Sequence, residues 1–152
     1  MDPVVHFEMP YENARRVAKF YESAFGWVMR KLGEEMGHYV LATTTETDES
    51  GPKRRGAING GFTPRGRGGP AQQPSLVIAV GDAGKAMKRV KDAGGRVLGA
   101  PVDIPGVGRY VSFADTEGNR SSMLQPIPRN WHAPDAGQRH RRRRARMPGR
   151  SR

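Results

Sequence analysis

The sequence predicts an α+β fold in which two βαβββ modules form an open, curved mixed sheet around a central cleft. The first reason is an internal repeat, because a strand, helix and strand pattern at 4–29 recurs at 76–98, with Asn13 matching Asp82 at an offset of 69. The second is that each copy is followed by further strand candidates in the same order. Neither copy can bury a core alone, so we expect the modules to pack together and share one site.

The first module opens with a predicted strand at 4–9, in which apolar and polar residues alternate. Successive side chains of a strand point to opposite faces, so His6 and Glu8 share one face and the apolar residues share the other. Asn13 can then cap a helix that ends at Gly26. Further strands of this module are expected at 27–29, 38–45 and 57–63.

The apolar residues of the first predicted helix recur at intervals of three and four, which indicates one apolar face. Phe20 and Phe25 belong to this pattern, and we expect both to anchor the helix to the sheet. Arg16 and Lys19 fall on the opposite side and are expected to be exposed.

A glycine pair, Gly60-Gly61, follows Asn59 within the strand predicted at 57–63. Glycine pairs in strands indicate either a β-bulge or the close approach of another group, which a side chain at that position would prevent. Of the two, we favour the bulge alone.

The second module repeats the order of the first, from an apolar run at 76–80 through the cap Asp82 to a helix that ends at 94–95. Further strands are expected at 96–98, 110–114 and 121–125. The repeat therefore predicts eight strands and two helices in all.

The two modules cover about 3–70 and 71–127, and together they form one predicted domain at 1–127. The remaining residues, 128–152, are rich in arginine and lose all periodicity, which is typical of a disordered tail. Eight arginines and no acidic residue follow position 138, which leaves +3 of the total charge of +11 for the rest of the chain. The tail could associate with nucleic acid, because arginine clusters neutralise phosphates, or it could have no selected role.

Composition excludes several classes of function. The chain contains no cysteine, which excludes disulfides, thiolate metal ligands and a cysteine nucleophile. The longest aliphatic run, at 76–80, is far shorter than the roughly 20 residues that span a bilayer, so we expect a cytoplasmic protein with no membrane partner. Unpaired sheet edges favour a homodimer.

Several motifs stand in a characteristic order: VVHFEMP before ARRVAKFYESAFGW, AINGGF near the centre, AGGRV, and IPGVGRYVSFADTEGN before MLQP. Together they resemble the vicinal oxygen chelate superfamily, which has the fold of glyoxalases, bleomycin resistance proteins and extradiol dioxygenases. The resemblance covers about residues 3–127. It implies two βαβββ modules whose curved sheets enclose a ligand cleft.

The resemblance also implies where a metal would be held. Enzymes of the superfamily use a His or Gln on the first strand, a His on the matching strand of the second module and a Glu on the last strand. His6 matches the first position, Val77 or Ser75 the second, and Ser122 the third. Two of the three ligand positions are therefore lost and no cofactor is expected, although a divalent metal at an atypical site formed by His6 and Glu8 stays open.

Three functions remain in competition. The first, which we adopt, is metal-independent binding of a small neutral or anionic molecule, favoured by the lost ligand positions and the mild positive charge. The second is an enzyme, either a metal-dependent lyase, isomerase or dioxygenase, or a metal-free catalyst built on His6 and Glu8. The third is nucleic-acid association through 128–152. The residues predicted to line the cleft are His6, Glu8, Tyr39, Asn59, Arg109, Tyr110 and Ser122.

Overall fold

The computed structural model describes residues 1–66 and 73–127, and the predicted tail at 128–152 lies outside them. The first half contains β1 (Val4–Tyr11), α1 (Ala14–Phe25), β2 (Val28–Lys31), η1 (Glu34–Met36), β3 (Val40–Thr43), β4 (Thr47–Asp48), β5 (Gly51–Pro52) and β6 (Asn59–Pro64). The second half contains β7 (Ser75–Ala79), α2 (Ala83–Asp92), β8 (Arg96–Ile104), β9 (Gly108–Ala114) and β10 (Arg120–Pro126). Neither α1 nor α2 is long and apolar enough to cross a membrane.

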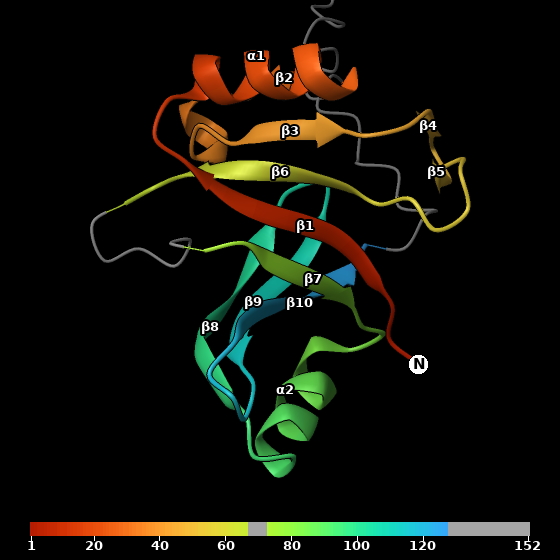
Figure 1. Cartoon of the computed structure of the whole chain (residues 1–152). Helices are drawn as coiled ribbons and strands as arrows, with labels where there is room; N and C mark the ends of the chain where they lie inside the picture. The colour runs from red at the N-terminus through yellow and green to blue at the C-terminus, as the bar shows by residue number, and fades with distance from the viewer. Residues whose placement is uncertain (67–72, 128–152) are drawn as a thin grey trace, which may run out of the picture.

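The strands form one open sheet of eight in the order β2-β3-β6-β1-β7-β10-β9-β8, as Figure 1 shows, while β4 and β5 pair separately. Each module has a parallel pair, β1 with β6 and β7 with β10. The modules meet where β1 and β7 pair in antiparallel fashion, and we call this pairing the seam. The predicted α+β fold with an open mixed sheet is confirmed.

Both helices begin at the predicted caps. The Asn13 side chain accepts a hydrogen bond from the backbone N–H of Arg16 at 2.9 Å, and the Asp82 side chain accepts one from Lys85 at 2.8 Å. Each cap satisfies a backbone donor that the first helical turn leaves unpaired. At the end of α1, Gly26 adopts a left-handed conformation with φ of 68°, which glycine allows without strain.

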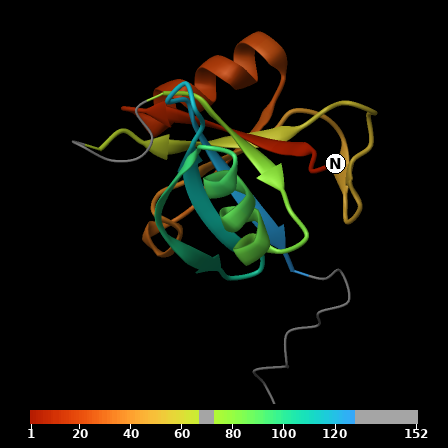
Figure 2. The ribbon, with the colours of Figure 1, turned by 90° about the horizontal axis from the view of Figure 1, so that it is seen from below.

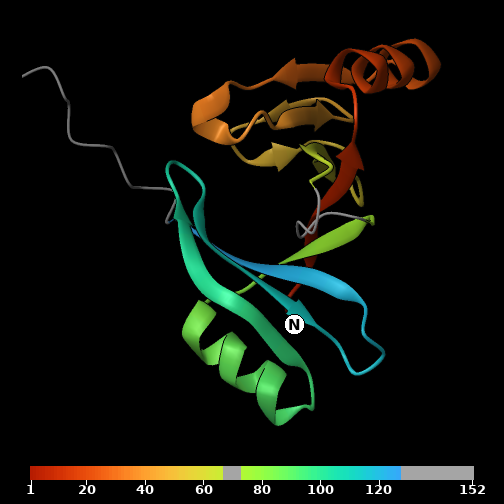
Figure 3. The ribbon, with the colours of Figure 1, turned by 90° about the vertical axis from the view of Figure 1, so that its left-hand side faces the viewer.

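The two helices cover the same face of the sheet. Phe7 packs under α1 beside Tyr21, and it faces Leu76 across the seam. Partners on adjacent strands point to the same side, and Ile78, two residues after Leu76, packs in the cluster under α2. Figure 3 shows the two helices at opposite ends of the molecule with the sheet curving between them, and Figure 2 shows α2 against the strands of its own half.

The other face carries no helix of the described segments, and we call it the open face. Its strands contribute a set of mostly polar side chains around the seam: His6, Glu8, Tyr39, Ser75, Val77, Tyr110, Ser112, Arg120 and Ser122.

The buried core is divided between the modules. Under α1 it consists of Val40, Ala42 and Phe62. Under α2 a second cluster contains Val80, Ala86, Val111 and Met123. Each helix covers a cluster on its own half of the sheet, and the expectation that one copy could not bury a core without the other stays a prediction. The seam joins two small cores instead of crossing one large core.

The prediction that Phe20 and Phe25 anchor α1 to the sheet is wrong. Phe20 is 57% exposed and Phe25 is 62% exposed, whereas Ala18 is buried. Phe20 follows Ala18 by two residues, about 200° around a helix of 3.6 residues per turn, so it points away from the sheet. Tyr21 anchors the helix instead, because its ring stacks on Trp27 at 4.6 Å between centroids. The prediction that Arg16 and Lys19 are exposed is confirmed.

These burials predict a difference between two phenylalanines. Phe62 is 1% exposed within the cluster under α1, so Phe62→Ala should lower the free energy of unfolding by about 3 to 5 kcal/mol. Phe20→Ala should cost about 1 kcal/mol or less, because the ring is already largely in water. Urea denaturation of both variants measures this difference, and equal losses would contradict the placement of α1.

Candidate functional site

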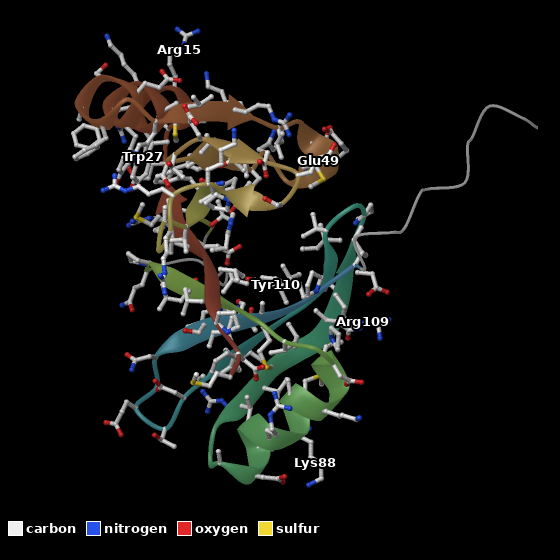
Figure 4. The ribbon with its side chains drawn as sticks, turned by 90° about the vertical axis from the view of Figure 1, so that its right-hand side faces the viewer. Arg15, Trp27, Glu49, Lys88, Arg109 and Tyr110 are labelled. Atoms are coloured by element: carbon white, nitrogen blue, oxygen red, sulfur yellow. The ribbon has the colours of Figure 1, made fainter. Side chains whose placement is uncertain are left out.

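A group of polar side chains gathers on the open face beside the seam. His6 and Glu8 lie on β1, Tyr39 directly precedes β3, Tyr110 lies on β9 and Ser122 lies on β10. Tyr110 lies between the two halves of the sheet in Figure 4. The first module therefore supplies three of these side chains and the second module two.

A chain of hydrogen bonds crosses from the second module to the first. The phenol of Tyr110 donates to Oε2 of Glu8 at 2.8 Å and accepts from the hydroxyl of Ser122 at 2.6 Å. The Oγ atoms of Ser122 and Ser112 lie 3.3 Å apart, and Ser122 is only 1% exposed. Side chains from both modules thus hold Glu8 in one position, and a polar chain of this kind fixes geometry when its members are satisfied.

A second hydrogen bond lies next to this chain. Nε2 of His6 and the phenol oxygen of Tyr39 are 2.8 Å apart, and the two rings are nearly parallel. Both side chains are half-buried. The phenol of Tyr39 thereby comes close to Glu8, whose negative charge contributes to raising the pKa of that phenol.

The glycine pair of β6 explains how Tyr39 reaches this position. A Cβ atom on Gly61 would collide with the ring of Tyr39 on the open face, and one on Gly60 would collide with the ring of Phe7 on the helix side. The pairing of β1 with β6 is regular here, with Phe7 facing Gly60. The favoured interpretation of a β-bulge is therefore wrong, and the pair instead allows the close approach of one aromatic ring on each face.

Burial governs the electrostatics of the group. Burial raises the pKa of Glu8, while the hydrogen bond from Tyr110 and the charge of Arg120 act in the opposite direction. Burial lowers the pKa of His6 and, together with the charge of Glu8, raises the pKa of Tyr110 to about 12. Desolvation disfavours the charged form of each group, so the site favours a neutral imidazole and protonated phenols.

Arg120 is a member of the site that the sequence analysis missed. It precedes Ser122 by two residues on β10 and therefore shares its face. The register of β1, β7 and β10 places one strand between it and Glu8, and its charge acts to lower the pKa of Glu8. Residues 120–122 are all polar, so the sequence does not indicate which of them share a face with Glu8.

Asn59 and Arg109, which were predicted to line the cleft, have side-chain partners outside the group around Glu8. Asn59 faces His6 across β1 and β6, but its side chain bonds the backbone of Thr44 at 3.0 Å and the hydroxyl of Thr47 at 2.9 Å. Arg109 precedes Tyr110 and so lies on the helix side, where it is exposed and bonds Asp103 at 2.8 Å. The structure therefore does not bring the Arg109 side chain to the group around Glu8.

The three positions at which the family resemblance implies metal ligands are neighbours in the sheet. His6 faces Val77 across the seam, and Ser122 faces Val77 across β7 and β10. Val77 has no donor atom, and the hydroxyl of Ser122 is bonded to Tyr110. This set does not fit a metal ion that needs three protein ligands. Within residues 1–66 and 73–127, three or more His, Cys, Asp or Glu side chains nowhere gather in a metal-binding arrangement.

A hollow of about 300 Å³ lies at the end of the seam, where Glu8 faces Ser75. Most of its lining is apolar, and the residues that form it are Phe7, Glu8, Met9, Trp27, Pro74, Ser75 and Leu76. Phe7, Met9 and Leu76 point to the helix side of the sheet, so the hollow lies mainly on that side and, apart from Glu8, the polar group on the open face lies outside it.

Comparison with known proteins identifies the family. The model of the Glyoxalase/Bleomycin resistance protein/Dioxygenase superfamily matches residues 4–122. The curated relatives include "Putative glyoxylase CFP32" from Mycobacterium bovis and from Mycobacterium tuberculosis, each 41% identical over 53 residues, or 35% of this chain. The matched part spans only 20% of the length of those relatives.

Solved structures with a similar fold include two epimerases. The methylmalonyl-CoA epimerase of Mycobacterium tuberculosis has a TM-score of 0.60 and 13% identity, with 82% of this chain and 88% of that chain covered. A Streptomyces coelicolor methylmalonyl-CoA epimerase variant in complex with 2-nitronate-propionyl-CoA has a TM-score of 0.61 and 15% identity, with 82% and 97% covered. At these identities the likeness establishes the fold alone.

The position of Tyr39 above Gly61 predicts the effect of a single methyl group. Gly61→Ala should displace the Tyr39 ring, break its hydrogen bond to His6 and cost about 1 to 3 kcal/mol of stability through overpacking. His6 then gains access to water, so its lowered pKa should rise toward 6.5. Titration of the His6 ring by NMR measures this rise. Gly60→Ala is the matched control, because it displaces Phe7 on the other face and should leave the pKa of His6 unchanged.

The raised pKa of Glu8 predicts a pH dependence of stability. Between 4.5 and its folded-state pKa, Glu8 binds more protons in the folded than in the unfolded protein, so its contribution to stability falls as the pH rises. Glu8→Gln removes this loss and retains an acceptor for Tyr110. The stability of the variant relative to the wild type should therefore increase between about pH 4 and pH 8. Urea unfolding at several pH values tests this, and Glu22→Gln on the exposed side of α1 controls for the lost charge.

The lowered pKa of His6 has the opposite effect, because its contribution to stability rises with pH. As the pH drops below 6.5, the unfolded protein takes up a proton on His6 before the folded protein does, and stability falls. This contribution is common to the wild type and Glu8→Gln, so the difference between them isolates Glu8. A difference that does not change with pH would contradict the assigned environment of Glu8.

Proposed function

Because the chain belongs to the Glyoxalase/Bleomycin resistance protein/Dioxygenase superfamily, we propose that it binds a small neutral or anionic molecule on the open face of its sheet, without a metal ion. The observation that carries the proposal is the hydrogen-bonded chain that joins Tyr110 and Ser122 of one module to Glu8 of the other. A small number of convergent, fixed polar groups is a usual feature of a small-molecule site.

The donor set supports binding without a metal. Of the three side chains that stand side by side on β1, β7 and β10, only His6 is a strong ligand for a divalent ion. Its Nε2 atom is already bonded to Tyr39, and Glu8 is bonded to Tyr110. Two donors held by separate partners form a poor site for an ion that requires three or more.

The charge of the site supports a neutral or anionic ligand. Arg120 adds a positive charge beside Glu8, and burial of Glu8 favours its uncharged form. A cation would therefore meet a guanidinium and a carboxyl group that is less readily ionised than in water.

Proton transfer by Glu8 is a second candidate function, favoured by one observation. A half-buried carboxyl group with a raised pKa and a phenol within 2.8 Å is the kind of pair that accepts a proton from a bound molecule and returns it. In this reaction the Glu8 carboxylate takes a proton from an acidic C–H bond, and the ligand keeps the electron pair until the proton is returned. A metal-dependent lyase, isomerase or dioxygenase has no comparable support.

The expected partners extend the proposal. Strands β2 and β8 are the outer strands of the eight-stranded sheet, and either free edge could pair in a homodimer. We propose such a dimer in the cytoplasm. Association with nucleic acid would involve 128–152, which lies outside the described residues.

A fragment screen by NMR tests the proposed function. In the presence of EDTA, neutral and anionic fragments should shift the amide signals of Glu8, Tyr110 and Ser122, and added zinc or manganese should not strengthen binding. Tyr110→Phe should weaken binding roughly tenfold, since it leaves Glu8 and Ser122 without their common partner. Tyr11→Phe is the matched control, because Tyr11 bonds the backbone of His38 away from Glu8.

Two results would contradict the proposal: no fragment shifts signals of the open face, or binding appears only when a metal is added. Deuterium exchange into a bound fragment in heavy water, lost in Glu8→Gln, would favour proton transfer over binding alone.

A further inference from the structure

Glu8 and Arg120 are opposite charges on one face that do not form an ion pair with each other. Both side chains are half-buried, and within residues 1–66 and 73–127 neither belongs to an ion pair. Tyr110 bonds only Oε2 of Glu8. The second oxygen, Oε1, accepts no hydrogen bond from the described residues, and it is not among their fully buried polar atoms. Oε1 is therefore not completely buried.

The register of the sheet sets the spacing of the two groups. Glu8 faces Ser75 across the seam, and Ser122 faces Val77 across β7 and β10. Arg120 precedes Ser122 by two residues and so lies beside Ser75, at the level of Glu8. One strand separates β1 from β10, which puts the backbones of Glu8 and Arg120 about 10 Å apart. The charge of Arg120 acts to lower the pKa of Glu8 across this spacing.

We propose that Arg120 and Glu8 together anchor a small carboxylic acid that carries a hydroxyl group next to its carboxylate. This inference rests on the proposed function and names its ligand class. A guanidinium group binds a carboxylate through two parallel hydrogen bonds, which gives Arg120 the anionic end of the ligand. Oε1 of Glu8 then accepts a hydrogen bond from the hydroxyl group of the ligand. Ser75, which lies between them in the register of the sheet, has a small side chain.

The surroundings favour a hydroxyl group over an ammonium group at Glu8. Transfer of an ammonium ion to a half-buried position costs more than transfer of a hydroxyl group. Burial raises the pKa of Glu8, so a cation at this position gains less from its carboxyl group than from an exposed one. An acid without any donor would cover Oε1 and leave it unsatisfied, which is costly in a desolvated site.

Three small probes of nearly equal size separate these contributions. Glycolate carries both groups, acetate lacks the hydroxyl group, and glycolamide lacks the charge. Titrations followed by NMR, including the Nε–H signal of Arg120, should show glycolate binding roughly tenfold more tightly than either of the others. Arg120→Gln should reduce the affinity for glycolate to that for glycolamide. Arg120→Lys, which keeps the charge without the paired bonds, should lie between the two.

Arg109→Gln is the matched control, because Arg109 is an exposed arginine on the opposite face of the neighbouring strand. It should leave all three affinities unchanged. Equal affinities for the three probes, or equal losses in Arg120→Gln and Arg109→Gln, would overturn the inference. If screened fragments shift open-face signals while glycolate does not, this inference fails and the proposed function stands. If no fragment shifts them, both fail.

Discussion

The rest of the structure depends on the antiparallel pairing of β1 with β7. Each module buries its own cluster under its own helix, so the hydrogen bonds of this seam are what make one sheet from two halves. The seam also sets the register that places Glu8 opposite Ser75. A shift of one residue would turn Glu8 toward the helices and Phe7 toward the open face, because strand side chains alternate with a period of two.

The open face is polar around the seam, where a protein without a binding site would be expected to have apolar residues. Burial of polar groups costs free energy unless they are hydrogen-bonded, and the bonds from Ser122 to Tyr110 and from Tyr110 to Glu8 meet that requirement from both modules. Glu8 nevertheless keeps a raised pKa, which means that burial outweighs the favourable contacts. Perturbed carboxyl groups of this kind are concentrated in functional sites, which is consistent with a ligand at the seam.

Small residues matter as much as the polar ones. Gly61 makes room for the ring of Tyr39, and Gly60 makes room for Phe7 on the other side of the same strand. Ser75 is the small residue between Glu8 and Arg120. The side chains of the site are thus positioned partly by small neighbouring residues that leave space for them.

Local pattern in the sequence was sufficient for the fold and for part of the site. The repeat, the caps Asn13 and Asp82, and the alternation around His6 and Glu8 all depend on residues close together in the chain, so they could be predicted without the structure. The tertiary structure alone decided that Tyr21 anchors α1 and that Arg120, in place of Arg109, lies beside Glu8. Those outcomes depend on which side of a helix or strand meets its neighbour, and strand register between distant segments is invisible to local periodicity.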